Sequence, residues 1–385
     1  MSNKIGLAIA IHTINYGTFL QAFATQEAVR SLGYDTEILN INSVIDDVSR
    51  ARKKYFLSRI FSLTELKSYR HIISAILTKK INKKYRSYIS DREKCFSDFS
   101  KKYFSVGEIC DSWKGLSEHC ESFSSVLVGS DQLWRPANIA GNFYTLNFVP
   151  EHVNKVSYAT SFGLNEIREN QRDIASEFLN RIQCLSSREE SGVKIIENLT
   201  GRNAEMVCDP TLLLGQERWN GFLDPHPIVD GDYVFVYLLG NDKSHRAYIR
   251  KLAKTLSCKI VGVIHGAGYI KGDENFVDEI PLNVGPFEFL NLIKHAKCVC
   301  TDSFHGCVFS TVFEKDFYAF KRFSDKDKMS TNTRVVGLLK KIDALDRLVE
   351  SYDCVSFDSI DYSKINERVD DFRNYSIGFL TKSLK

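Results

Sequence analysis

Short apolar runs alternate with stretches of helical spacing from the first residues onward. Residues 5–11 are apolar, residues 18–32 repeat apolar positions at helical spacing, and residues 36–41 are apolar again. An apolar run between polar turns is typical of a buried strand, whereas spacings of three and four residues indicate a helix. Gly33 stands where helices commonly end. The chain therefore opens with a predicted strand, helix and strand.

The same alternation continues to about residue 320. Further strands are predicted at residues 125–128, 156–160, 185–187, 204–207, 233–239, 259–264, 298–301 and 317–320. Helices are predicted at residues 165–181, 243–256, 286–295 and 304–313. Thr18 and Ser187, each followed three residues later by Gln or Glu, predict capping boxes. Strands separated by helices of this length predict parallel sheets joined by right-handed crossovers.

A chain of 385 residues predicts two domains rather than one. We expect an N-terminal domain over 1–222 with a basic helical insertion at about 49–102, and a C-terminal domain over 230–350. The polar, proline-containing residues 224–227 would link them. Residues 351–385 are predicted to be helical and to pack back on the N-terminal domain. The predicted fold class is α/β, with two Rossmann-like, doubly wound domains that face each other across a cleft.

Composition is that of an ordinary globular chain. It is 43% hydrophobic and 26% charged with 7 prolines, which excludes disorder as the main content. No apolar run reaches the roughly 18 residues that a membrane-spanning helix needs. The apolar stretch after Lys4 imitates a short signal peptide, but His12 and Asn15 follow it and no cleavage pattern is present, so it is interpreted as a strand.

Cysteine usage and the absence of several motifs narrow the chemistry. The ten cysteines lack paired spacing, which favours reduced thiols and a cytoplasmic location. Cys298 and Cys300 are interpreted as small buried hydrophobes of one strand rather than as a metal site. There is no G-x-x-x-x-G-K-[ST] loop, no G-x-S-x-G elbow and no H-E-x-x-H or C-x-x-C pattern. We therefore expect no metal and no bound cofactor.

Charge is concentrated in one stretch of the chain. The net charge is +3, but the segment from Arg50 to Lys102 carries 16 Lys and Arg against four acidic residues. This stretch is also rich in apolar residues at helical spacing. It is either a solvated helical hairpin with an apolar core face, or a surface that contacts an anionic membrane or a phosphorylated lipid carrier. The remaining chain is acidic and has no nucleic-acid module, so we expect no nucleic-acid partner.

Polar side chains gather where the predicted strands end, which is where ligands bind in parallel α/β sheets. The most informative loop is residues 301–306, because it joins a buried strand to a helix. Asp302 or Ser303 would be its N-cap and His305 would lie in the first helical turn. A histidine there is suited to proton transfer beside an anionic substrate near neutral pH.

Two other strand exits carry charged side chains. Arg188 would hold a phosphate or carboxylate bidentately, or form a surface ion pair with a neighbouring glutamate. Asp131 would be a base, an anchor for a sugar hydroxyl, or simply a turn residue. Gln132 and Trp134 would supply an amide and a stacking surface for a carbohydrate. Asp209, which precedes a proline, is interpreted as a turn and packing residue.

The order of these motifs resembles one known family. The motifs are Asn15-Tyr16-Gly17 with Leu20-Gln21-Ala22, Val128 to Trp134, Tyr158 to Gly163, Ser187-Arg188-Glu189, Cys208 to Leu213, and Thr301 to Gly306. Together they resemble the polysaccharide pyruvyl transferase family over about residues 5–340. The resemblance implies a fold like that of the GT-B glycosyltransferases. It also implies transfer of the enolpyruvyl group of phosphoenolpyruvate, a co-substrate, to sugar hydroxyls, giving a pyruvate ketal.

The resemblance also implies roles for particular residues. His305 matches the catalytic histidine of the family, and Arg188 matches an arginine that holds the donor, with Asp131 beside them. As acceptor-binding residues we predict Asn15, Tyr16, Gly17, Gln21, Gln132 and Trp134. Related enzymes act on lipid-linked oligosaccharides at the inner membrane face, so the expected acceptor is a glycan or lipid-linked oligosaccharide for a capsule or exopolysaccharide. Peripheral contact with that membrane is expected too.

One position departs from the family pattern. Members carry an arginine two residues before the histidine, where this chain has Ser303. A cation from elsewhere must then bind the donor together with Ser303, and Lys321, Arg322 and Arg334 are the candidates.

Two other functions stay open at this point. A GT-B glycosyltransferase that uses a nucleotide sugar would need a ribose-binding acid at a helix start, for which Glu288 is the candidate. A catalytically silent glycan-binding module would keep its ligand without His305.

Overall fold

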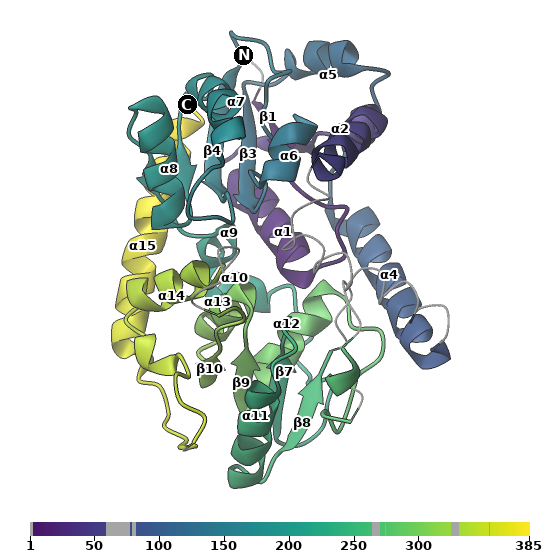
Figure 1. The fold of residues 1–385 in the computed structure, drawn as a ribbon, viewed down its shortest axis with the longest axis vertical. Helices are drawn as coiled ribbons and strands as arrows, with labels where there is room; N and C mark the ends of the chain where they lie inside the picture. Colours follow the sequence, from purple (N-terminus) through teal and green to yellow (C-terminus); the bar gives the residue numbers. More distant parts are fainter. Residues whose placement is uncertain are drawn as a thin grey trace.

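The structure is a computed structural model, and it describes residues 3–58, 78, 82–263, 270–273, 275–324, 331–353 and 355–385. Two parallel sheets form its centre, one above the other in Figure 1. Within the described residues, no helix is both long enough and apolar enough to cross a membrane.

The N-terminal sheet has the strand order β2-β1-β3-β4, and all of its strands are parallel. Its strands are β1 (Lys4–Ala8), β2 (Asp35–Ile38), β3 (Ser125–Asp131) and β4 (Asn154–Thr160). A short parallel pair, β5 (Ser186–Ser187) and β6 (Glu205–Met206), continues beyond β4. The helices of this half are α1 (Tyr16–Ser31), α2 (Ile45–Leu57), α4 (Lys83–Tyr103), α5 (Trp113–Cys120), α6 (Pro136–Gly141), α7 (Glu169–Asn180), α8 (Glu190–Thr200), α9 (Pro210–Leu213) and α10 (Gly215–Asn220), with a 3-10 turn η1 (Ile41–Val44).

The C-terminal sheet has the order β10-β9-β7-β8 and is also parallel. Its strands are β7 (Tyr233–Tyr237), β8 (Lys259–Gly262), β9 (Cys298–Thr301) and β10 (Phe317–Ala319). Its helices are α11 (Lys243–Thr255), α12 (Pro286–His295), α13 (Phe304–Val312) and α14 (Asn332–Lys341), with 3-10 turns η2 (Lys271–Asp273) and η3 (Leu345–Arg347). Strands β3, β7, β9 and β10 are buried almost throughout, which explains their unbroken apolar runs, whereas Asp35 of the edge strand β2 is exposed. The predicted α/β class with parallel sheets is confirmed.

The helix starts differ from the predicted capping boxes, both of which are wrong. Asn15, not Thr18, caps α1, and its side-chain oxygen accepts a hydrogen bond from the Thr18 amide at 3.1 Å. Asn is an efficient cap in extended backbone, so the helix begins two residues earlier. Glu189, not Ser187, is the N-cap of α8, and it makes no side-chain capping bond. Gly33 does follow α1 in the left-handed conformation, with φ of 89°.

The basic insertion is described only in part, because residues 59–77 and 79–81 lie outside the described residues. Helix α4 buries an apolar face: Phe96 lies 4.6 Å from Phe19 of α1, and Phe99 lies 4.8 Å from Phe287 of α12, between ring centroids. This is the core face that one of the two interpretations predicted. At the end of α2, by contrast, Leu57 is 64% exposed.

Two features join the halves of the molecule. The Tyr16 hydroxyl donates to the Val284 carbonyl at 2.9 Å, and its ring stacks on Phe289 at 4.3 Å. Helix α15 (Tyr362–Ser383) runs along both halves on one side (Figure 1). The Cys208 amide donates to Ser376 of α15 at 2.8 Å, so α15 packs directly behind the strand exit at β6.

Candidate active site

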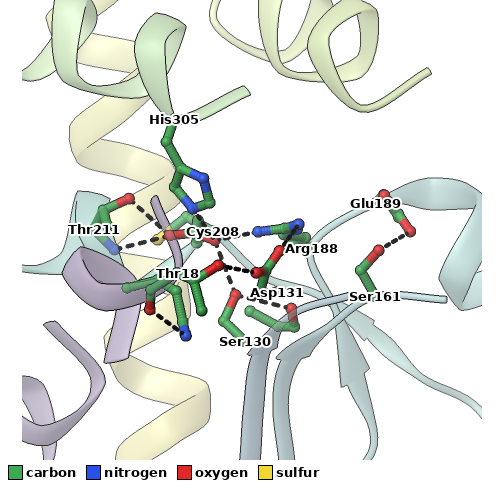
Figure 2. A network of polar contacts seen from close by, with 12 residues as sticks. Thr18, Ser130, Asp131, Ser161, Arg188, Glu189, Cys208, Thr211 and His305 are labelled. Carbon is green, nitrogen blue, oxygen red and sulfur yellow. Dashed lines mark hydrogen bonds and ion pairs between the residues drawn. The ribbon is translucent and has the colours of Figure 1, made fainter. Parts of the chain in front are cut away.

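Four charged side chains meet between the two sheets (Figure 2). Asp131 ends β3, Arg188 follows β5, and Asp209 lies just beyond β6, so all three come from strand exits of the N-terminal half. His305 comes from the other half, in the first turn of α13. The parallel sheets therefore bring the strand exits together as the sequence analysis expected.

Asp209 is the centre of this cluster. One carboxylate oxygen, Oδ2, accepts hydrogen bonds from Ser130 Oγ at 2.9 Å and from Arg188 Nη1 at 2.7 Å. The same oxygen lies 3.6 Å from Nε2 of His305. The other oxygen accepts from the amide and the hydroxyl of Thr211, at 3.1 and 2.7 Å. Asp209 is thus more than the turn residue that the sequence suggested.

The pKa of Asp209 is held well below its ordinary value. Burial by itself would raise this pKa, but the nearby His305 and Arg188 and the hydrogen bonds from Arg188 and Thr211 outweigh that effect. The side chain has no exposed surface. Asp209 therefore stays an anion that faces the imidazole throughout the neutral range.

Arg188 connects two carboxylates. Its Nη1 donates to Asp209 and its Nη2 donates to Asp131 Oδ1 at 3.0 Å, and the guanidinium lies 4.6 Å from the centre of the Phe304 ring. The side chain is only 1% exposed, so the alternative of a surface ion pair is wrong. Nη1 and Nη2 each donate to a carboxylate, so Arg188 fixes Asp131 and Asp209 in place, while its Nε is buried without a hydrogen-bond partner. A guanidinium has five N–H groups, so binding of the donor by Arg188 stays a prediction.

Asp131 is a strained and strongly acidic residue. Its backbone is left-handed, with φ of 63°, which is uncommon for a residue other than glycine and is concentrated at functional sites. Its second oxygen accepts from Thr18 Oγ1 at 2.9 Å. Burial raises its pKa, but Arg188, His305 and Arg334 together lower it to about 2. A carboxylate this acidic favours the anchor interpretation over the base.

His305 is enclosed by the first turn of α1. Its side chain is 8% exposed, and Nε2 has no hydrogen-bond partner although it faces Asp209. A Cβ atom at Gly17 would lie 2.6 Å from Cγ and 2.8 Å from Cε1 of the imidazole, closer than atoms can approach. Only glycine therefore fits at position 17. Ser303 is the N-cap of α13, as predicted, and accepts from the Gly306 amide at 3.4 Å.

A cavity of about 930 Å³ opens beside this cluster. Arg188, Asp209 and Phe304 line it, whereas His305 and Asp131 do not, and α8, α14 and α15 supply most of the remaining lining. Its lining holds seven cationic side chains against three carboxylates; the cations are Arg188, Lys194, Lys321, Arg334, Lys340, Lys341 and Arg368. Such a surplus of positive charge is suited to an anionic ligand.

The three candidate cations differ in where they lie. Arg334 lines the cavity, and its Nε is buried without a hydrogen-bond partner. Burial and the neighbouring positive charges of Arg188 and Arg322 lower the pKa of Arg334 to about 9, so it remains charged at neutral pH. Lys321 also lines the cavity, and its Nζ lies 3.9 Å from Oε1 of Glu350. Arg322 does not line it and donates to the Asp302 carbonyl at 2.9 Å.

Comparison with known proteins shows the family to which the chain belongs. The family model described as polysaccharide pyruvyl transferase matches residues 15–322, which include all four central residues. The chain belongs to the polysaccharide pyruvyl transferase family. It is therefore a transferase of polysaccharide biosynthesis, as its motifs predicted. A comparison with curated protein sequences gives no match.

Several solved structures are similar to this pyruvyl transferase at low sequence identity. UDP-GlcNAc 2-epimerase from Methanocaldococcus jannaschii is 12% identical with a TM-score of 0.44, over 97% of this chain and 99% of that chain. UDP-N-acetylglucosamine 2-epimerase from Rickettsia bellii is 7% identical with a TM-score of 0.49, over 98% and 94%. The glycosyltransferase SnogD from Streptomyces nogalater is 11% identical with a TM-score of 0.41, over 98% and 95%.

Several predicted acceptor-binding residues of the transferase do not reach the cavity. Trp134 has no exposed surface; its Nε1 donates to the Tyr144 carbonyl at 3.0 Å and its ring packs against Phe162 and Phe178. It cannot stack on a sugar in this arrangement. Tyr16 is buried between the two halves. Gln21 is also buried, and its side-chain Nε2 donates to the Thr18 carbonyl at 2.9 Å.

The other predicted acceptor residues have structural contacts. Asn15 caps α1, Gly17 makes room for His305, and the side chain of Gln132 lies against Gly163. Glu288, the candidate for ribose binding, accepts from the Gly285 amide at 3.0 Å at the start of α12. It does not line the cavity.

Sequence reasoning missed or undervalued three polar residues of the site: Ser130, Asp209 and Glu189. Both Ser130 and Asp209 come at or just after the end of a predicted strand, which was the available signal, but Pro210 led to the interpretation of Asp209 as a turn and packing residue. Glu189 was treated as an exposed neighbour of Arg188, yet it is only 7% exposed and lines the cavity. The exposed acid is the next residue, Glu190, which pairs with Lys194 at 2.6 Å.

Proposed function

We propose that this pyruvyl transferase moves the enolpyruvyl group of phosphoenolpyruvate onto two hydroxyls of a sugar in a surface polysaccharide precursor, forming a pyruvate ketal. The observation that supports this most is the His305–Asp209 pair beside a cation-rich cavity. Proton donation to a vinyl carbon needs a titratable acid, and a phosphorylated carboxylic acid needs positive charge around it. Both stand at one place between the two sheets.

The chemistry follows from the donor. A proton from His305 is added to C3 of phosphoenolpyruvate, and C2 becomes an oxocarbenium-like centre. One sugar hydroxyl forms a bond to C2 and loses its proton. The bond between C2 and the phosphate oxygen then breaks, phosphate leaves with a proton, and a second hydroxyl closes the ketal. The proton of that second hydroxyl restores His305, so atoms and charge balance over the cycle.

Arg334 is the cation that we assign to the donor in place of the family arginine missing at Ser303. It lines the cavity with a buried, unpartnered Nε and is repelled by Arg188 and Arg322, so a bound anion would relieve both penalties. Lys321 lies on the same lining and would share this role. Arg188 acts as a positioning residue, because it holds Asp131 and also Asp209, which faces His305 and lines the cavity.

The acceptor we propose is a glycan that carries phosphate, such as a lipid-linked oligosaccharide. A three-carbon donor fills only part of a cavity of about 930 Å³, and a second set of cations remains farther along its lining: Lys194, Lys340, Lys341 and Arg368. The exposed Leu57 beside the lysines of α2 supports peripheral contact with an anionic membrane surface. The reaction would then take place in the cytoplasm at the inner face of the membrane.

We propose that the reaction needs neither a metal nor a bound cofactor. Among the residues that the structure describes, no group of three or more His, Cys, Asp or Glu is arranged to hold a metal ion. Phosphate release should therefore persist in EDTA. Strict loss of activity with EDTA would contradict this part of the proposal.

Phosphate release from phosphoenolpyruvate by the purified protein, with a set of glycosyl acceptors, tests the proposal. We expect release that depends on the acceptor and that His305→Ala and Arg188→Ala both abolish. If phosphoenolpyruvate neither binds nor turns over while a nucleotide sugar does, the protein is a glycosyltransferase of the same family fold. If ligand binding survives His305→Ala and no turnover is found with any donor, it is a glycan-binding module.

A further inference from the structure

Glu189 lines the cavity and has one carboxylate oxygen that is buried without a hydrogen-bond partner. One of its oxygens, Oε1, accepts a hydrogen bond from Ser161 Oγ at 2.6 Å. The other, Oε2, is buried and has no hydrogen-bond partner. In Figure 2 this second oxygen points away from Ser161. A buried carboxylate oxygen without a partner is costly, and such groups persist where a ligand supplies the missing bond.

A short hydrogen-bond chain fixes the orientation of this carboxylate. The Gly163 amide donates to Ser161 Oγ at 2.9 Å, and the Ser161 hydroxyl in turn donates to Glu189. The orientation of the Ser161 hydroxyl is thereby fixed, because its oxygen accepts from Gly163 and its one proton is directed at Oε1 of Glu189. The backbone of Glu189 is extended, at the N-cap of α8, and its side chain is not used for capping. Oε2 is therefore held in place and left free.

Arg334 of α14, a helix of the other half, is the counterpart of Glu189. Both residues line the same cavity, and each has one buried polar atom without a hydrogen-bond partner, Nε on Arg334 and Oε2 on Glu189. Glu189 acts electrostatically on Arg334, yet the two groups form no ion pair with each other. Two residues that line one cavity therefore have an unpartnered acceptor, Oε2 of Glu189, and an unpartnered donor, Nε of Arg334. A hydroxyl group is the ligand chemistry that donates to a carboxylate while it also accepts from a guanidinium.

We propose that Glu189 is the base that takes the proton from the attacking hydroxyl of the sugar acceptor. This inference rests on the proposed function. The hydroxyl O–H bond breaks as the oxygen forms its bond to C2 of the donor, and the proton moves to Oε2. The proton then passes to the phosphate oxygen when the C2–O bond breaks. His305 keeps the separate role of acid and is restored by the second hydroxyl.

The other carboxylates of the site are less suited to this role. Both oxygens of Asp209 and both oxygens of Asp131 already accept hydrogen bonds within the protein. Glu190 lines the cavity, but it is exposed and its carboxylate pairs with Lys194. Of the three carboxylates on the described lining, only Glu189 combines burial with an open oxygen.

The test compares Glu189→Gln with Glu197→Gln, which removes an exposed carboxylate on helix α8 that does not line the cavity. Removal of a general base typically costs about 10²–10⁴-fold in rate. We therefore expect Glu189→Gln to lower kcat for acceptor-dependent phosphate release by at least about 100-fold. Phosphoenolpyruvate itself should bind with a dissociation constant within about threefold of the wild type, since Arg334 is unchanged. Glu197→Gln should keep kcat within about twofold, because surface substitutions away from a site have small effects.

Chemical rescue separates a base from a structural group. Formate added to Glu189→Ala should restore part of the turnover, because a small carboxylate can occupy the vacated space, and formate should not restore His305→Ala. If Glu189→Gln misfolds, Ser161→Ala gives a second test, since the carboxylate keeps its charge but loses its orienting bond and kcat should still fall. Wild-type kcat in Glu189→Gln would overturn this inference alone. A wild-type protein that never releases phosphate from phosphoenolpyruvate would overturn the proposed function instead.

Discussion

Replacing Asp209 with Asn should destabilise the protein and remove its activity together. The carboxylate has no exposed surface and accepts from Arg188, whose side chain is 1% exposed, while it faces His305 at 3.6 Å. Asn keeps the shape, but its NH₂ group would meet another donor at either Arg188 or Thr211. Removing one partner of a buried ion pair costs about 3–5 kcal/mol. Because Arg188 keeps Asp131 as a partner, we expect about 3 kcal/mol, the lower end of that range.

Urea denaturation at neutral pH measures this change directly. Asp230→Asn is the control, since Asp230 is exposed and should change the free energy of unfolding by less than about 0.5 kcal/mol. A difference below about 1 kcal/mol between wild type and Asp209→Asn would refute the energetic reasoning, because it would mean that the cluster carries no net ion-pair energy.

The pH dependence of stability provides a second readout of Asp209. Its pKa is lower in the folded protein than in the unfolded chain, so its contribution is complete above the unfolded value of about 3.9 and is lost as the pH falls toward the folded value. Wild-type protein should therefore lose stability below about pH 4 more steeply than Asp209→Asn. Equal slopes for the two proteins in this acid range would contradict the lowered pKa.

Three further predictions concern other parts of the molecule. Gly17→Ala should displace His305 and lower kcat while the fold is kept. The control is Gly378→Ala on α15, where a Cβ meets nothing within 4 Å and kcat should not change. Equal kcat values for the two variants would show that the close packing of Gly17 on His305 does not matter. Arg334→Ala should raise KM for phosphoenolpyruvate by at least about tenfold with a smaller effect on kcat, and an unchanged KM in steady-state assays would exclude it as the donor cation. Leu57→Ser should weaken sedimentation with vesicles that contain anionic lipid without affecting zwitterionic vesicles, and undiminished binding would place the membrane contact elsewhere.

The parallel sheets and the strand exits could be predicted from the sequence because they depend on local patterns. Residues 298–301, for example, form the predicted strand, and Ser303 caps the helix after it. The apolar run and the cap residue determine both features within a few residues of chain. Arg188 and His305 were found for the same reason, since Arg188 directly follows β5 and His305 lies in the first turn of the helix after β9.

The role of each side chain at a strand exit could not be predicted in the same way. Trp134 and Asp209 both follow strands, but the ring of Trp134 packs into the core while Asp209 faces His305 from the other half. This choice depends on how the two sheets meet, a contact between residues almost a hundred positions apart. Arg188 illustrates the same limit, because its two carboxylate partners come from separate strands.

The net charge of the cluster changes when His305 gives its proton to the donor. With a proton on His305, the two positive charges of His305 and Arg188 balance the two carboxylates of Asp131 and Asp209. Transfer of that proton to the donor leaves the cluster with one net negative charge next to the phosphate that is about to leave. Charges of like sign repel most strongly where water is excluded, and the side chains of Arg188 and Asp209 are almost fully buried. Under the proposed chemistry, proton transfer itself therefore favours departure of the phosphate toward Arg334 and the outer cations of the cavity.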